Sequence, residues 1–308
     1  MDEILVSGLI NLEITLRIDS FPIQYTPVRY PFFGVNSSVS GVGYNVAKAL
    51  TVLGDGVRFL SVIGQDAAGK LVADSLAADG IPNDLVIAQA ERTAHSVILF
   101  DGSGRRQINV DLKDIQEQEY PALPFEQALA RCSLAVLCNV NFSRPFLRKA
   151  KQAGKLIATD VHTVSDLEDE YNRDFMAAAD ILFMSDESLP CSPEAWVRLI
   201  LNRYGAEIVV VGLGKQGALL SVRSDHFVER IPAARIRQVV NTIGAGDALF
   251  SAFVHAYSQR GDPYEAIEKA TLFASYKIGE QGAAAGFLTR DELDRRYLEW
   301  KEIGAVDG

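Results

Sequence analysis

The stretch GYNVAKALTVLGDGVRFLSVIG, residues 43–64, places a helical pattern directly before a strand-like one. In its first half, apolar residues recur at helical spacing up to Gly54, a residue type that often follows a helix C-terminus. Its second half, VRFLSVIG, is almost continuously apolar, as in a strand that is covered on both faces. The stretch therefore predicts a helix that leads into a buried strand, which is part of a βαβ unit.

The same alternation runs along most of the chain. Further buried-strand candidates are EILVSGLI (3–10), LAVLCNV (134–140), KLIATDV (155–161), ADILFMS (179–185) and EIVVVGLG (207–214). Further helical patterns are AAGKLVADSLAADG (67–80), SRPFLRKAKQAG (143–154) and PEAWVRLILNRYG (193–205). Strands separated by helices predict an α/β fold with a doubly wound, mostly parallel sheet and helices on both faces.

Two segments interrupt this alternation. Residues 14–35 are rich in proline and aromatic residues, and residues 92–112 read as two strands joined by a DGSG turn. Together they predict a small β-sheet that is inserted as a lid over a cleft, or else an extra edge hairpin. We therefore divide the chain into a core of residues 1–13, 36–91 and 113–308 and a lid of residues 14–35 and 92–112.

The bulk composition excludes several classes of function. The net charge is −10, and no basic run of five or more residues offsets it, which argues against a nucleic-acid-binding protein. No apolar run reaches about 18 residues, so no membrane span is expected. The N-terminus lacks a signal-peptide pattern, and the three cysteines are too few for a disulfide framework, so we expect a cytoplasmic protein.

The stretch NTIGAGDALFSAF, residues 241–253, combines a small-residue turn with the start of a helix. Gly244, Ala245 and Gly246 allow a tight turn, so free backbone N–H groups should cluster at the helix N-terminus. Such a cluster, at the positive end of the helix dipole, favours an anion such as a phosphoryl group. Asp247 is then either a first-turn acid that complements the dipole or a general base that takes a proton from a hydroxyl group.

A second glycine cluster is SVSGVGYNV, residues 38–46, in which Gly41 and Gly43 precede a helix whose first turn carries Asn45. The Asn45 amide either binds hydroxyl groups of a ligand or caps the helix.

A third cluster is VVVGLGKQGALL, residues 209–220, which contains the pattern G-x-G-x-x-G at Gly212, Gly214 and Gly217. A strand pattern follows it, whereas the dinucleotide fingerprint requires a helix there. The segment is therefore a hairpin turn or a loop that lines a nucleotide. Lys215 at its tip either meets a phosphate or is solvated.

Two of these stretches together resemble the PfkB, or ribokinase-like, carbohydrate kinase family. SGVGYNVAKALTVLGDGVRFLSVIG (40–64) is similar to the N-terminal signature of that family, and NTIGAGDALFSAFV (241–254) is similar to its C-terminal signature. The resemblance covers nearly the whole chain. It implies a doubly wound α/β core with a small β lid, and transfer of the γ-phosphoryl group of ATP, with Mg²⁺, to an alcohol of a sugar.

The resemblance also implies roles for particular residues. Asp247 would be the base, and the amides around Gly244, Ala245 and Gly246 would form the anion hole. The substrate side would be lined by Asn11, Glu13, Gly41, Gly43 and Asn45. The nucleotide side would be lined by Gly212, Gly214, Lys215, Gly217 and Thr242.

Three positions depart from the family pattern. Glu13 stands where members often have Asp, which moves the carboxylate by one methylene. Asn241 replaces the aspartate that in many members helps to hold a monovalent cation, so activation by K⁺ is left open. SDES, residues 185–188, stands where the N-x-x-E motif linked to magnesium is expected. Asp186 and Glu187 are the candidates for holding Mg²⁺ through water.

Several alternatives follow from these departures. The acceptor is a sugar or sugar-like molecule or, alternatively, a nucleoside. The third alternative is a non-catalytic regulator that binds a sugar or nucleotide. Arg105 and Arg106 either reach the ligand or are solvated, and Phe32 and Phe33 either pair with a second subunit to form a homodimer or cover the active site.

Overall fold

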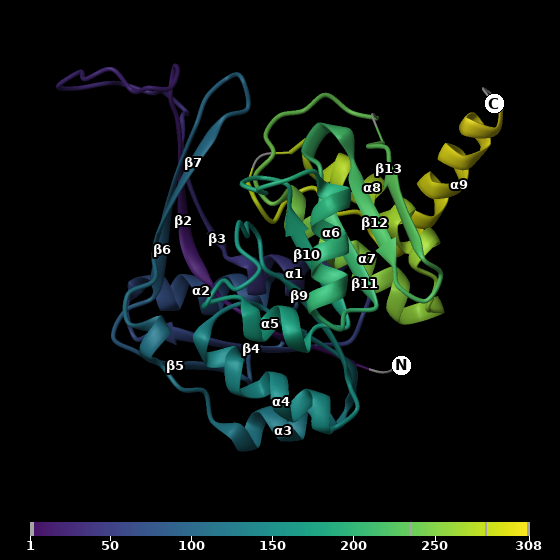
Figure 1. Ribbon diagram of the computed structural model, residues 1–308. Coiled ribbons are helices and arrows are strands. Elements are labelled where there is room, and N and C mark those ends of the chain that lie inside the picture. The colour runs from purple at the N-terminus through teal and green to yellow at the C-terminus, as the bar shows by residue number, and fades with distance from the viewer. Residues whose placement is uncertain (1–2, 235, 281, 307–308) are drawn as a thin grey trace.

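The computed structural model of the chain describes residues 3–234, 236–280 and 282–306. At its centre lies a nine-stranded sheet with helices on both faces (Figure 1). The strands neighbouring one another in this sheet are, in order, β13 (Phe227–Ile231), β12 (Ala218–Val222), β11 (Ile208–Gly212), β10 (Ile181–Ser185), β9 (Leu156–Asp160), β8 (Cys132–Leu137), β1 (Glu3–Ser7), β4 (Val57–Gly64) and β5 (Val86–Ala90). From β5 to β11 all neighbours pair in parallel, and β12 and β13 form an antiparallel edge. The predicted doubly wound, mostly parallel α/β fold is confirmed.

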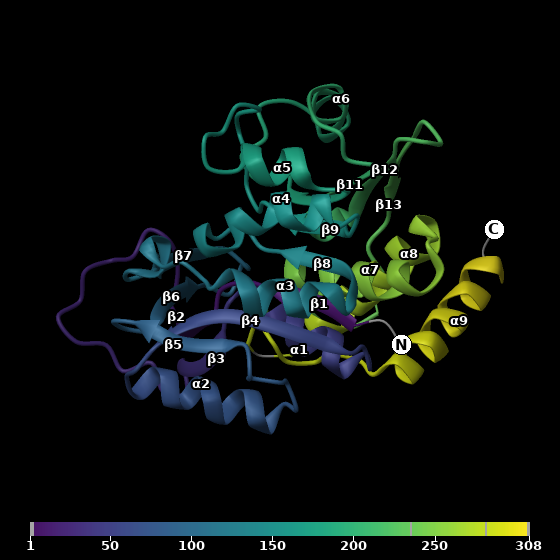
Figure 2. The same ribbon diagram turned by 90° about the horizontal axis from the view of Figure 1, so that it is seen from below.

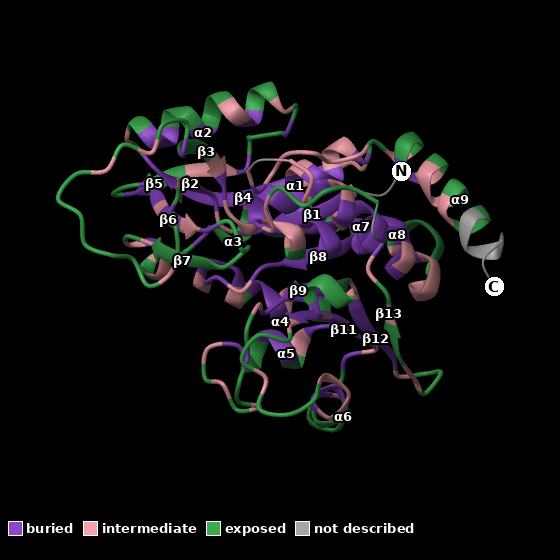
Figure 3. Cartoon of the chain, turned by 90° about the horizontal axis from the view of Figure 1, so that it is seen from above, coloured by how far each residue is buried: buried purple, intermediate pink, exposed green. Residues whose placement is uncertain are grey.

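The buried strands each contribute to two apolar cores, because successive side chains point to opposite faces of a sheet. Ile4 and Val6 of β1 lie in one core, and Leu5 between them lies in the other. The helices that contribute to the first core are α1 (Val42–Val52), α2 (Ala67–Ala78), α7 (Ala245–Arg260), α8 (Pro263–Lys277) and α9 (Arg290–Val306). Those of the second core are α3 (Ala122–Ala130), α4 (Arg144–Gln152), α5 (Arg173–Ala178) and α6 (Pro193–Arg203). Figure 2 shows these two helical layers, and Figure 3 shows the buried sheet between them.

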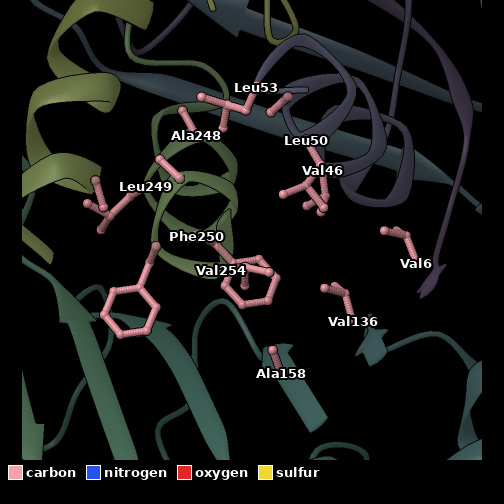
Figure 4. Packing of buried hydrophobic residues seen from close by; sticks show 14 of the residues in the cluster. Val6, Val46, Leu50, Leu53, Val136, Ala158, Ala248, Leu249, Phe250 and Val254 are labelled. Carbon is pink, nitrogen blue, oxygen red and sulfur yellow. The ribbon is translucent and has the colours of Figure 1, made fainter. Parts of the chain in front are cut away.

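Helices α1 and α7 are fixed side by side over the centre of the sheet. Figure 4 shows Val46 and Leu50 of α1 together with Ala248 and Phe250 of α7 above the strands. The Phe250 ring lies 4.9 Å from the Phe183 ring of β10, measured between centroids. Each large apolar side chain buried in this way contributes about 1.5–3 kcal/mol, so the starts of both helices are held firmly above the sheet.

A second, smaller sheet stands at one end of the main sheet (Figure 1). We call it the small sheet, and its strand order is β3 (Val35–Ser40), β2 (Asn11–Arg17), β6 (Ala94–Phe100) and β7 (Arg106–Asp111). β2 and β6 pair in parallel, whereas β2–β3 and β6–β7 are antiparallel. The predicted strand pair around the DGSG turn is the β6–β7 hairpin.

Residues 11–13 and 36–40, which the sequence-based division places in the core, belong to strands of the small sheet. The reason is that polar Asn11 and Glu13 alternate with apolar residues, as in a sheet whose two faces differ, instead of continuing the apolar run of β1. The function of this sheet as a lid stays a prediction.

Short 3₁₀ helices occur at Ile115–Glu117, Asn141–Ser143 and Gly214–Gln216. No helix in the described part of the chain combines the length and the apolar character that a membrane crossing requires.

Candidate active site

The turn that leads into α7 depends on a glycine at its last position. Gly244 is the residue before the helix, with φ of 75°, and a Cβ atom there would lie 2.3 Å from the carbonyl oxygen of Ala283. No other residue type fits this position without movement of the backbone. The Ala245 amide donates to the carbonyl oxygen of Thr242 (3.2 Å), and the first α-helical bond runs from Ala248 N to Gly244 O (3.0 Å). The amides of Gly246 and Asp247 lie between these two bonds, at the start of α7, where helix amides lack an intrahelical acceptor.

Asp247 and Asn45 meet although 202 residues separate them in the chain. The Asn45 amide nitrogen, Nδ2, donates a hydrogen bond of 2.6 Å to Oδ2 of Asp247. The Ser40 hydroxyl donates to the other end of the Asn45 amide, Oδ1, at 3.4 Å. Asn45 therefore does not cap α1, whose first residues receive no side-chain cap, but orients the Asp247 carboxylate.

The environment of Asp247 acts on its protonation. Burial raises the pKa of this half-buried carboxyl above the ordinary value of an aspartate, although the Asn45 hydrogen bond and the positive charge of Lys277 oppose the rise. A carboxylate with a raised pKa is a stronger base. The sequence leaves two roles open for Asp247, an acid that complements the helix dipole or a general base. Its environment favours the base.

Asn11 and Glu13 bring unpartnered polar atoms to the same side of the small sheet. Both are buried, and among the described residues neither Asn11 Oδ1 nor Glu13 Oε1 has a hydrogen-bond partner. Burial raises the pKa of Glu13, and the negative charge of Asp247 adds to the rise, while the nearby Ser40 hydroxyl lowers it. Leaving such atoms unpaired costs about 1–3 kcal/mol each, which a ligand with hydroxyl groups would recover.

Gly41 and Gly43 have a structural role at the start of α1. A Cβ atom on Gly43 would lie 2.4 Å from the carbonyl carbon of Gly8, so glycine lets the helix approach β1 closely. Gly41 is the N-cap of α1 and has φ of 105°. Contacts of either glycine with a substrate stay a prediction.

The ends of β10 and β11 form the other side of the site. The Asp186 amide donates to the carbonyl oxygen of Gly212 at 3.0 Å, so SDES and the third glycine cluster lie together. Residues 212–217 form the hairpin turn between antiparallel strands β11 and β12, which excludes the dinucleotide fingerprint. Lys215 at its tip is exposed. Burial, with the charge of Glu187, raises the pKa of Asp186.

The family follows from comparison with known proteins. The profile of the pfkB family carbohydrate kinases matches residues 1–290. The chain belongs to the PfkB family. It is a carbohydrate kinase, that is, a phosphotransferase that acts on an alcohol group, and use of ATP is expected of PfkB kinases.

This kinase is similar to several named proteins over most of its length. It is 25% identical over 297 residues to the ATP-dependent ribose-1-phosphate kinase of Halopiger xanaduensis, which covers 92% of this chain and 94% of the relative. It is 29% identical over 259 residues to the 1-phosphofructokinase of Haloferax volcanii, covering 80% and 81% of the two chains. Among solved structures, a microbiome-derived acarbose kinase aligns with a TM-score of 0.87 at 28% identity, covering 97% and 99% of the two chains.

Arg105 and Arg106, next to each other at the start of β7, behave differently in the kinase. Arg105 is held within the small sheet by the Asp101 carboxylate, at 2.8 Å. Arg106 reaches the core instead: its Nη1 donates to the Thr242 hydroxyl at 2.8 Å, and its Nη2 lies 3.7 Å from the Glu187 carboxylate. Arg106 therefore connects the small sheet to both loops at the edge of the main sheet.

Lys277 belongs to the site and was missed from the sequence. It lies in the last turn of α8, its exposure is 0%, and its Nζ donates to the carbonyl oxygen of Ile243. A lysine in the last turn of a helix is commonplace, since it complements the helix dipole and usually reaches solvent. The available signal is its place in a helix with an apolar face that directly follows the Asp247 helix.

Asn241, the departure at the start of the second signature, holds the turn together. Its Nδ2 donates to the carbonyl oxygen of Glu280 (3.1 Å), and its Oδ1 accepts from the amide of Ile243 (3.0 Å). These are the contacts of a neutral amide, because one end must donate and the other accept.

Proposed function

We propose that this kinase transfers the γ-phosphoryl group of ATP to a hydroxyl group of a sugar or sugar-like molecule, with Asp247 as the general base. The observation that carries the proposal is the 2.6 Å hydrogen bond that fixes the Asp247 carboxylate at the start of α7. Burial raises the pKa of this carboxyl, and the backbone amides at the start of the same helix support its role beside a phosphoryl group. A positioned base contributes about 10²–10⁴-fold to a proton-transfer step.

In the proposed reaction the chain's own residues orient both reacting groups. The buried oxygens of Asn11 and Glu13 accept hydrogen bonds from acceptor hydroxyls. The attacking hydroxyl gives its proton to Asp247 as its oxygen bonds to the γ-phosphorus and the bond to the leaving ADP oxygen breaks. The amides of Gly244, Gly246 and Asp247 would face the charge that spreads over the transferred oxygens. The Ala245 amide, also predicted for this role, instead donates to the carbonyl oxygen of Thr242.

The nucleotide side of the proposal uses the loops at the ends of β10 and β11. Gly212, Gly214, Lys215, Gly217 and Thr242 would line the ATP molecule. Asp186 and Glu187 supply two neighbouring carboxylates, and Mg²⁺ in kinases is commonly held by one or two carboxylates, waters and the phosphates. Asp186 and Glu187 would hold Mg²⁺ through water, together with the phosphates. Bound Mg²⁺ would neutralise phosphate charge.

The small sheet would act as the lid of this site. It supplies Asn11 and Glu13 to the substrate side, and Arg106 bonds to Thr242 on the nucleotide side. Closure of such a lid excludes water, which would otherwise accept the phosphoryl group.

The small sheet would also pair with that of a second subunit. Ile108 and Val110 of β7 are each 50% exposed, and Phe32 and Phe33 are almost fully exposed. Exposed apolar side chains of this kind favour association. The homodimer is tested by light scattering of the purified kinase and of an Ile108→Lys, Phe33→Lys variant. A monomeric wild-type protein would remove this part of the proposal. A cytoplasmic location also stays a prediction.

The acceptor is tested by ATP consumption with Mg²⁺ against hexoses, pentoses, their phosphates and the nucleosides adenosine, inosine and cytidine. Turnover with a free sugar or sugar phosphate is the expected result. Turnover with nucleosides alone would favour the nucleoside kinase, and tight ligand binding without turnover would favour the non-catalytic regulator. Family membership supports the enzyme over the regulator.

A further inference from the structure

Lys277 is a fully buried lysine next to the turn that carries the catalytic groups. Its side chain has 0% exposure, although lysine is almost never fully buried unless it is paired. The partner of its ammonium group is the backbone carbonyl oxygen of Ile243. This carbonyl directly precedes Gly244, from which α7 and the free amides begin.

The charges around Lys277 come from three elements. Asp247 of α7 and Glu13 of β2 favour the charged ammonium, whereas Arg106 of β7 opposes it. Burial outweighs the two carboxylates and lowers the pKa of Lys277 to about 8, so the group still carries its charge at neutral pH. The site thus holds a fixed positive charge between the base, the buried glutamate and the phosphoryl-binding turn.

The oxygens around this turn do not fit an exchangeable monovalent cation. A K⁺ ion is held by oxygen atoms, which must turn their lone pairs to it. Here the Ile243 carbonyl accepts from Lys277, the Glu280 carbonyl accepts from Asn241 Nδ2, and Asn241 Oδ1 accepts from the Ile243 amide. Each of these oxygens therefore already has an N–H donor, which leaves one lone pair on each. A second cation there would also face the ammonium that lies on the Ile243 carbonyl, and position 241 carries a neutral amide in place of a carboxylate.

We propose that Lys277 is a positioning residue that acts as the built-in cation of this kinase: its ammonium holds the Ile243 carbonyl, and with it the phosphoryl-binding turn, so that activity needs no K⁺ or other monovalent cation. The inference rests on the proposed function, since it takes residues 244–247 as the phosphoryl-binding turn. In this inference Lys277 and Asn241 together stabilise the phosphoryl-binding turn. Asn241 closes the turn with internal hydrogen bonds, and Lys277 supplies the charge.

The test compares two buried lysines of the same helix. Lys277→Ala removes the proposed cation, and Lys269→Ala removes a lysine that pairs with Glu265 and Asp294, two helical turns away. For each protein kcat is measured with NH₄⁺ and with tetramethylammonium, which is too large for the space that an ammonium leaves. Wild type and Lys269→Ala should show the same kcat in both salts. Lys277→Ala should lose about tenfold or more in kcat and regain part of it only in NH₄⁺.

Two results would overturn the inference. A wild-type kcat that rises when NH₄⁺ or K⁺ replaces tetramethylammonium would mean that the kinase depends on an external cation. A Lys277→Ala variant whose kcat is equal in the two salts would mean that no replaceable charge acts there. The wild-type comparison holds even if the variant does not fold.

Melting temperature supplies a readout that does not depend on turnover. A cation that binds only the folded state raises the melting temperature with its concentration. Wild type should melt at the same temperature in K⁺ and in tetramethylammonium at equal ionic strength, and Lys277→Ala should gain stability specifically in NH₄⁺. If no acceptor is turned over, the proposed function fails while this comparison still decides the role of Lys277. K⁺-specific stabilisation of wild type would contradict that role.

Discussion

Replacing Asp247 by asparagine should separate catalysis from stability. The Asn45 amide donates to Oδ2 of Asp247 at 2.6 Å, and an asparagine at 247 still offers a carbonyl oxygen to this donor. The geometry of the site should therefore survive, and only the ability to accept a proton is lost. Loss of a general base costs about 10²–10⁴-fold in rate, which corresponds to roughly 3–5 kcal/mol of transition-state stabilisation.

The same substitution should leave the fold as stable or make it more stable. Burial raises the pKa of Asp247 above the value of an unfolded chain, so the folded state binds this proton more tightly than the unfolded state does. Ionisation of the carboxyl therefore destabilises the fold once the pH exceeds the ordinary value of an aspartate. Asparagine cannot ionise, so Asp247→Asn should melt at the wild-type temperature or above it near neutral pH.

The assay is ATP consumption with the best acceptor of the panel, together with thermal unfolding. Asp55→Asn is the matched control, because Asp55 is a buried carboxylate that contacts His255 near the other end of α7 at 2.7 Å. That variant should lose stability and keep kcat. An Asp247→Asn variant whose kcat falls by no more than about tenfold would refute the role of Asp247 as the base, because removal of a general base should cost at least about 10²-fold. A large drop in its melting temperature would refute the electrostatic reasoning.

Three further outcomes follow from the site. Glu13→Gln should raise KM for the acceptor by roughly tenfold and change kcat less, since a charged hydrogen bond contributes about 1.5–3 kcal/mol. Steady-state kinetics measure both constants, and an unchanged KM would mean that Glu13 does not contact the substrate. Arg106→Ala removes the contacts to Thr242 and Glu187, so KM for ATP should rise while Arg105→Ala leaves it unchanged. The pH profile of kcat/KM should fall on the acid side at a pH above the ordinary pKa of an aspartate, because protonated Asp247 cannot accept a proton, and Asp247→Asn should lack this limb.

Most of the main sheet could be predicted because local sequence controls it. Strands that are covered on both faces must be apolar throughout, so runs such as residues 208–212 and 181–185 are recognisable without any tertiary information. The extent of the small sheet was less accessible. Residues 11–13 follow β1 after only a short break. They belong to the small sheet, and not to the main sheet, because they pair with residues 94–96, far along the chain.

The candidate site could be predicted only in part. The two signatures identify Asn45 and Asp247, but their contact spans 202 residues, and no local pattern reveals that the Asn45 amide binds the carboxylate instead of capping its helix. Lys277 was missed for a related reason. Its burial depends on how α8 packs against α7, whereas its position in the last turn of a helix is the ordinary one for a solvated lysine.

The attachment of the small sheet restricts how it can move. The chain enters and leaves this sheet twice, through the connections before β2, after β3, before β6 and after β7, so four covalent linkages join it to the main body. A body held at four points along one edge swings about a single hinge axis and does not flap like a loop. One of these linkages is only Gly41, between Ser40 of β3 and the first residue of α1. In the proposed closure, a swing of the small sheet would therefore pull directly on the helix that bears Asn45, and the amide that holds the Asp247 carboxylate would move with it.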